Sequence, residues 1–138
     1  MDLIIPLGIG VIVVFFVILI LSNTSKKSDG KWKTKVNSEL SKLSKSFNSN
    51  DQIVLKNTLI EMDKLLNFTL KSRKFSGNTL GERLKSSKKS FDWNIYQSIW
   101  EAHKKRNQLV HEVGVNINKD EIKVHIQSLN SGIRIMLK

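Results

Sequence analysis

The side chains best suited to chemistry lie in one stretch near the C-terminal end, and the first of them is Arg106. An apolar stripe at helical spacing leads up to it, formed by Ile95, Ile99 and Ala102. Because Arg106 continues that stripe, its guanidinium is expected on a face that should be buried. A buried charge is costly unless an acid pairs with it or it lines a polar cleft. The sequence leaves three acids open as partners, namely Glu61, Asp63 and Glu112.

His111 follows five residues later and brings an imidazole, which can take up or release a proton near neutral pH. On a continuous helix, five residues leave the two side chains about 140° apart in azimuth. Arg106 and His111 therefore meet on one ligand only if the helix ends near His111 or if a second subunit completes the site. Gly114 favours such an ending.

Polar and basic residues surround this pair. Asn107 is expected to orient a phosphate held by Arg106, and Lys104 and Lys105 to attract a nucleic-acid backbone without sequence preference. His103 lies one turn before Asn107 and could join the same polar surface. An exposed or interfacial histidine is the simpler interpretation of His103.

Metal and cofactor chemistry are not expected. The chain has three histidines and no cysteine, and no close carboxylate pairing accompanies them as in a metal site. The glycines of "SGNTLGE" (76–82) lack the lysine and the spacing of a P-loop. The aromatic residues at helical spacing, Trp93, Tyr96 and Trp100, could stack on bases. Core or dimer packing is the favoured interpretation for them.

The stretch "RNQLVHE" (106–112) resembles the signature of HEPN domains. In that signature an Arg is followed directly by a polar residue, and a His comes after four intervening positions, late in a small helical bundle. Together with "TLGERLK" (79–85) and "IWEAHKKRNQLVHE" (99–112), it is similar to small bacterial membrane-anchored proteins. The likeness covers about residues 50–137.

The resemblance implies two alternative functions. Active HEPN domains are metal-independent endoribonucleases, usually homodimeric, in which Arg106 would hold the phosphate and His111 would transfer the proton, with Asn107 beside them. Many HEPN domains are not nucleases, and that interpretation is favoured here. The chain is then an interaction or RNA-associated module, whose partner is RNA, a second copy of the chain or another protein. In that case Arg106 is a structural ion-pair residue and His111 is a packed histidine.

Residues 1–22 are expected to form a transmembrane anchor. Residues 3–21 carry no charge, and nineteen helical residues span roughly 28 Å, close to the ~30 Å hydrocarbon core of a bilayer. A cleaved signal peptide is disfavoured because no cleavage site with small residues follows. The basic side chains after the span are Lys26, Lys27, Lys31, Lys33 and Lys35. They predict an N-terminus outside and a C-terminal domain in the cytoplasm of a bacterial cell.

The net charge of +11 favours anionic partners. All 23 basic residues lie after residue 21, so the predicted domain is strongly positive. The lysines at 26–35 suggest electrostatic binding to anionic lipid of the bilayer as a further alternative. For the lysines alone, a solvated lysine surface beside an anionic membrane is the favoured interpretation.

The remaining chain is predicted to be all-α. Residues 23–30 are expected as a polar linker and residues 31–138 as a basic helical domain. Apolar periodicity predicts helices over 32–47, 55–70, 80–88, 92–109 and 118–136. Expected helix starts are Ser49 with Gln52, Thr79 with Glu82, Asp92, and Asn118 with Glu121. The fold class expected is an antiparallel four- to five-helix bundle.

Overall fold

The computed structural model confirms the all-α class for the residues that it describes, which are 4–112, 114, 115 and 117–138. In the first helix, side chains are described at 14, 15, 17, 18 and from residue 30 onward. These ranges contain no β-strand. The elements are α1 (Ile4–Phe47), α2 (Gln52–Ser72), α3 (Leu80–Ser87), the 3₁₀ turn η1 (Lys88–Ser90), α4 (Trp93–His111) and α5 (Lys119–Leu137).

The chain divides into two units, Met1–Thr34 and Lys35–Lys138. The boundary lies a few residues after the predicted end of the linker at residue 30. The expected linker over 23–30 is itself part of helix α1. Its residues are polar, but no proline interrupts them, and Lys and Ser are compatible with a helix interior.

Within the described part of the chain, no helix is long and apolar enough to cross a membrane. Residues 1–3 of the predicted anchor, and most of its side chains, lie outside the described residues.

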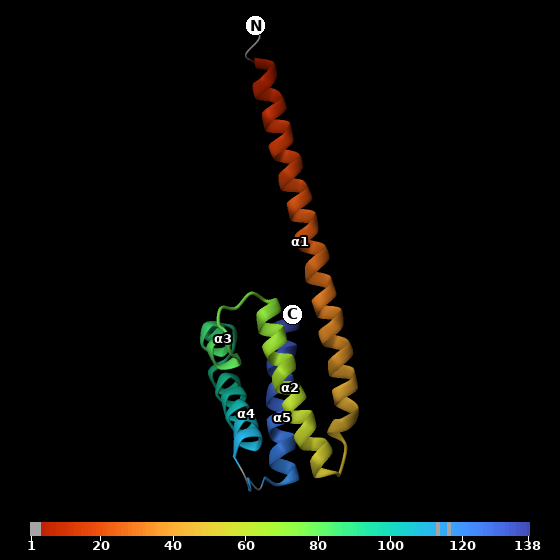
Figure 1. Cartoon of the computed structure of the whole chain (residues 1–138), viewed down its shortest axis with the longest axis vertical. Coiled ribbons are helices and arrows are strands. Elements are labelled where there is room, and N and C mark those ends of the chain that lie inside the picture. The colour runs from red at the N-terminus through yellow and green to blue at the C-terminus, as the bar shows by residue number, and fades with distance from the viewer. Residues whose placement is uncertain (1–3, 113, 116) are drawn as a thin grey trace. The chain divides into compact units, whose positions relative to one another are not determined.

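The second unit is a helical bundle in which α5 packs along both α2 and α4 (Figure 1). Its fully buried side chains recur at steps of three and four along the helices. They include Leu55, Leu59, Leu66 and Leu70 of α2, Ile99 of α4, and Ile122, Ile126, Leu129, Ile133 and Met136 of α5. Removing these apolar surfaces from water is the main driving force for the packing.

The helices α2, α4 and α5 alternate in direction, so that α2 and α5, which pack most closely together, run the same way (Figure 1). A hydrogen bond supports this register, because the Gln52 side chain at the start of α2 donates to the Ile117 carbonyl just before α5. The expected bundle is therefore present, but its central pair is parallel.

Two predicted helix starts are confirmed by side-chain caps. The Thr79 hydroxyl accepts a hydrogen bond from the Glu82 amide at 3.2 Å, and Asn118 Oδ1 accepts one from the Glu121 amide at 2.8 Å. Each cap satisfies an amide that has no partner inside its own helix.

The other two starts need correction or qualification. Asp51, not Ser49, caps α2 by accepting from the Ile53 amide at 2.8 Å. The predicted capping box of Ser49 and Gln52 is wrong, because the Gln52 side chain donates its hydrogen bond to the Ile117 carbonyl instead. Asp92 does occupy the N-cap position of α4, without a side-chain hydrogen bond to it.

Gly132 of α5 allows a close helix contact that we expect to be sensitive to size. A Cβ atom there would lie 2.7 Å from Ile99 Cδ1 and 3.6 Å from Leu66 Cδ1. Gly132→Leu should therefore lower the free energy of unfolding by about 1–3 kcal/mol, the usual cost of overpacking. Urea denaturation measures it.

Ser131→Leu is the matched control, because Ser131 is the exposed neighbour on the same helix. This control should stay within about 0.5 kcal/mol of the wild type. Equal unfolding midpoints for the two variants would contradict the close contact at Gly132.

Candidate functional site

A polar cavity of about 420 Å³ opens where α2, α3 and α4 meet. Each of these elements contributes three lining residues. They are Asp63, Lys64 and Asn67 from α2, Thr79, Leu80 and Gly81 from the start of α3, and His103, Arg106 and Asn107 from α4. The cavity contains two of the residues that the sequence singled out for phosphate chemistry.

Asp63 is the acid that pairs with Arg106. Its residue is 3% exposed, and its Oδ2 lies 3.4 Å from Arg106 Nε. Glu61, one of the alternatives, lies on the exposed side of α2 and pairs with Lys64 at 2.7 Å. The structure therefore resolves which of the three candidate acids meets the guanidinium.

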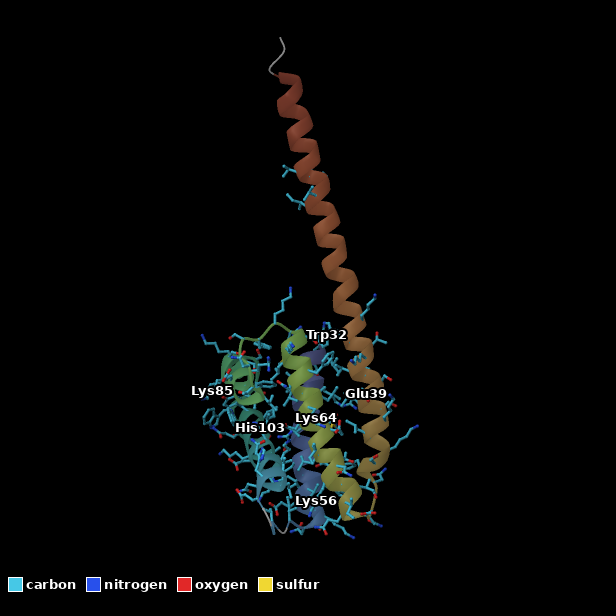
Figure 2. The ribbon with its side chains drawn as sticks, in the orientation of Figure 1. Trp32, Glu39, Lys56, Lys64, Lys85 and His103 are labelled. Carbon is cyan, nitrogen blue, oxygen red and sulfur yellow. The ribbon has the colours of Figure 1, made fainter. Side chains whose placement is uncertain are left out.

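His103 binds the other oxygen of the same carboxylate, with its Nδ1 2.8 Å from Asp63 Oδ1. A carboxylate can only accept, so Nδ1 carries the hydrogen. Figure 2 shows His103 on α4. His103 was expected to be exposed or interfacial, whereas its side chain is 13% exposed and belongs to the site.

Asn107 closes the network. Arg106 Nη1 donates to Asn107 Oδ1 at 2.9 Å, which directs the amide nitrogen of Asn107 toward His103 Nε2 at 3.3 Å. Because that nitrogen donates, His103 Nε2 is the acceptor of this contact. We call these four residues, Asp63, His103, Arg106 and Asn107, the Asp63 cluster.

Helix geometry explains how the Asp63 cluster forms. His103, Arg106 and Asn107 are spaced three and four residues apart, which places them on one face of α4. The spacing of His103 was the sequence signal that could have identified it. The apolar stripe that ends at Arg106 turns this face toward α2, so Asp63 meets all three side chains from the opposite helix.

Helix α3 forms the third wall through a small residue. A Cβ atom added to Gly81 would lie 3.3 Å from the Trp100 ring and 4.0 Å from His103 Nε2. Trp100 in turn contacts His103 edge to face, with ring centroids 5.9 Å apart. Gly81 thus permits α3 to approach the His103 side of the cavity closely.

Arg83 is a second buried guanidinium beside the cavity, and the sequence gave no reason to single it out. It is 7% exposed, and its Nη1 donates to Asn67 Oδ1 at 2.8 Å and to the Asn78 carbonyl at 3.2 Å. No carboxylate lies within ion-pair distance of it among the described residues. Its charge is held by neutral oxygens alone.

His111 lies elsewhere. It is the last residue of α4, which confirms that the helix ends there, and its side chain is exposed. It is not one of the residues that line the cavity. Within one chain the structure brings Arg106 and Asn107 together with His103, and it does not place His111 in the same cavity.

The predicted phosphate-binding lysines are engaged in ion pairs. Exposed Lys104 pairs with Glu101 at 3.0 Å. Lys105 pairs with Glu121 at 3.0 Å and so links α4 to α5. This second contact gives Lys105 a structural role in addition to its charge.

The lysines predicted to meet lipid headgroups are described in part. Lys31 is exposed, Lys33 lies over the Trp32 ring at 5.7 Å, and Lys35 lies over the Phe68 ring at 4.8 Å. The side chains of Lys26 and Lys27 lie outside the described residues.

The aromatic residues of α4 pack as expected only in part. Tyr96 is buried and contacts Trp100 edge to face at 6.3 Å. Trp93 is 58% exposed, with Lys88 Nζ 5.0 Å from its ring centroid. The described residues contain no group of three or more histidines and acids that could hold a metal ion.

His125 and Glu121 titrate away from the cavity, on α5. Burial lowers the pKa of His125 below its ordinary value of 6.5, against the opposing attraction of Glu121. The hydrogen bond from Lys105 lowers the pKa of the Glu121 carboxyl, with a further contribution from the charge of Lys105. The lowered pKa values favour the neutral form of His125 and the charged form of Glu121.

Comparison with known proteins gives no matching family model, and no curated protein or solved structure matches the chain.

Asp63→Asn tests the cluster, because it keeps the side-chain shape and removes the charge that Arg106 and His103 share. We expect the free energy of unfolding to fall by about 1–3 kcal/mol, the cost of leaving a partly buried charged group without its partner. Urea denaturation measures the change. Glu61→Gln, which breaks an exposed pair two residues away, should cost less than about 1 kcal/mol. Equal losses in both variants would argue against the cluster.

The lowered pKa of His125 predicts that stability falls on acidification. The unfolded chain takes up a proton near pH 6.5 while the folded chain resists it, so more protons bind to the unfolded state in this window. The melting temperature should drop as the pH falls from above 6.5 to below it. The lowered pKa of Glu121 adds a further loss below about its ordinary value of 4.5.

His125→Gln should flatten the first of these two losses, since glutamine does not titrate. His111→Gln is the control at an exposed histidine and should leave the pH dependence unchanged. A His125→Gln protein with the same slope as the wild type would show that another group is responsible.

Proposed function

We propose that this chain is a membrane-anchored HEPN-like module that associates with RNA at the cavity beside Asp63. The observation that carries the proposal is the charge around that cavity. Arg106 lies beside the buried carboxylate of Asp63, whereas the buried guanidinium of Arg83 donates to Asn67, which lines the cavity, and has no carboxylate partner among the described residues. An anionic group entering the cavity would balance the excess positive charge.

Arg106 has the donors that such a ligand requires. A guanidinium carries five N–H groups in a planar fork suited to phosphate. One of them is donated to Asn107, and Nε lies next to Asp63. The remaining donors, together with Asn67 and Thr79 on the opposite walls, would hold a phosphate of an RNA backbone.

Binding without cleavage agrees best with the hydrogen bonds of His103. Its Nδ1 is bound to Asp63, and its Nε2 is occupied by the Asn107 amide. An imidazole with both nitrogens occupied must first lose one partner before it can transfer a proton to substrate.

The anchor belongs to the same proposal. Residues 3–21 are free of charge, and the described side chains in this stretch, Val14, Phe15, Val17 and Ile18, are all exposed. We infer that this segment holds the chain in the cytoplasmic membrane of a bacterium with the N-terminus outside. The lysines at 26–35 would then lie near anionic headgroups.

RNA association is tested with the full chain in nanodiscs of phosphatidylcholine and a fluorescent single-stranded RNA at low salt. The double variant Asp63→Asn, Arg106→Gln removes the central ion pair without changing the net charge. It should weaken binding by roughly tenfold, because hydrogen bonds to charged groups contribute about 1.5–3 kcal/mol each. Fluorescence polarisation measures the affinity.

The matched control is Glu39→Gln, Lys42→Gln, which removes an exposed ion pair on α1 and also leaves the net charge unchanged. Its affinity should equal that of the wild type. If the two double variants bind RNA equally well, the cavity is not the RNA site.

A metal-independent endoribonuclease is the second candidate, favoured by the 2.8 Å contact in which Asp63 orients His103 next to Arg106. The resemblance to HEPN domains instead assigns the proton transfer to His111, with a second copy completing the site. Incubating the same RNA with the protein in the presence of a metal chelator separates these alternatives. Cleavage lost in His103→Asn supports the Asp63 cluster, cleavage lost in His111→Ala supports the HEPN pair, and no cleavage by the wild type supports binding alone.

A further inference from the structure

The two ends of the second unit differ sharply in charge. The stretch 71–92, from the end of α2 to the start of α4, contains seven basic residues and two acids. The opposite end, formed by 45–56 and 108–123, contains four basic residues and four acids. The charge of the bundle is therefore concentrated at one end, which we call the basic end.

Six side chains supply the accessible charge of the basic end, and all are exposed. They are Lys71, Arg73, Lys74, Lys85, Lys88 and Lys89. None of the six forms an ion pair with a described acid. The ammonium group of Lys88 lies over the rings of Trp93 and Tyr96, and these contacts leave its positive charge without an acidic partner.

The loop over 73–79 holds the two groups of lysines together. The Ser86 hydroxyl of α3 donates to the Ser76 carbonyl at 2.9 Å, and Arg83 donates to the Asn78 carbonyl at 3.2 Å. A left-handed backbone at Gly77, with φ of +134°, allows the loop to fold back in this way. The end of α2 and the start of α3, and with them Lys71 and Lys85, are thus held close together. Figure 1 shows these two helix ends at the same end of the bundle.

The chain also enters the second unit at the basic end. Lys35, its first residue, lies over the ring of Phe68 in the last turns of α2, and Leu43 lines a cavity together with Glu61 farther back along α2. The part of α1 within the second unit, residues 35–47, therefore runs antiparallel to α2 from the basic end. Figure 2 shows the separation, with Lys85 at the basic end and Lys56 at the opposite one.

The length of the tether then determines which end can reach a membrane. Residues 22–34 follow the apolar stretch and span at most about 20 Å as a helix. The 21 residues of α2 separate the opposite end of the second unit from the basic end by roughly 30 Å. Screening limits electrostatic attraction to about 10 Å at moderate salt, so only a surface near the attachment point can respond to headgroup charge.

We propose that the basic end of the second unit docks on anionic phospholipid headgroups of the membrane that holds the anchor. The inference rests on the anchor of the proposed function, but it concerns residues other than the lysines at 26–35. Lysines near an anionic surface are attracted additively. The orientation that results would keep α3 and the mouth of the nearby cavity close to the bilayer.

The absence of native cysteine allows one dye to be placed at each end of the full chain. Ser90→Cys reports on the basic end, and Asn50→Cys reports on the opposite end; both positions are exposed. The labelled proteins are reconstituted in vesicles of phosphatidylcholine, with or without phosphatidylglycerol, that contain a lipid-linked quencher. Quenching at residue 90 should rise roughly threefold with phosphatidylglycerol and return to the neutral-lipid value at high salt. Quenching at residue 50 should not change.

A charge-reversed triple variant tests the residues. Lys71→Glu, Lys85→Glu, Lys89→Glu should abolish the effect of phosphatidylglycerol. The matched control Lys45→Glu, Lys56→Glu, Lys119→Glu makes the same charge change at the opposite end and should preserve the effect. Circular dichroism melting of both triples checks that each is folded.

Three results would overturn the docking. The first is equal quenching at residue 90 in neutral and anionic vesicles. The second is an equal effect of phosphatidylglycerol on quenching in the two triple variants. The third is an RNA affinity that falls in the basic-end triple variant while its lipid quenching is unchanged. Failure of the anchor is recognised separately, because an unanchored chain would not float with pure phosphatidylcholine vesicles. Flotation only with phosphatidylglycerol, together with quenching at residue 90, would support docking and contradict the anchor.

Discussion

The carboxylate of Asp63 is the interaction on which the candidate site depends. It is buried on α2, and it binds His103 through one oxygen and Arg106 through the other. Without it, the partly buried guanidinium of Arg106 on α4 would lack its counter-charge, at a cost of about 1–3 kcal/mol. The tautomer of His103 follows from this carboxylate, and the rotamer of Asn107 follows from the guanidinium that the carboxylate holds.

The same network limits the chemistry of the site. A general base needs a free lone pair, and the lone pair of His103 Nε2 faces the Asn107 amide. A phosphate ligand needs donors, and Arg106 retains donors that have no hydrogen-bond partner among the described residues. The cluster is therefore better arranged to bind an anion than to cleave one, unless binding first displaces Asn107.

Much of the bundle could be predicted from the sequence, because apolar spacing and caps are local signals. The helices ending near Ser72 and His111 and the caps at Thr79 and Asn118 follow from such patterns. The sequence left three acids as possible partners of Arg106, because the helix register that selects Asp63 among them depends on tertiary packing. His103 was undervalued because its partner, Asp63, lies 40 residues away in the sequence.

Arg83 shows most directly why the site could not be completed from the sequence. It follows Glu82 at the start of a short helix, where an exposed, solvated arginine is the ordinary expectation. Instead, α3 approaches α4 at Gly81 and turns Arg83 toward Asn67. The buried Nε of Arg83 has no hydrogen-bond acceptor in the described structure. An anion bound beside this desolvated charge would stabilise the folded state, and with it the position of α3.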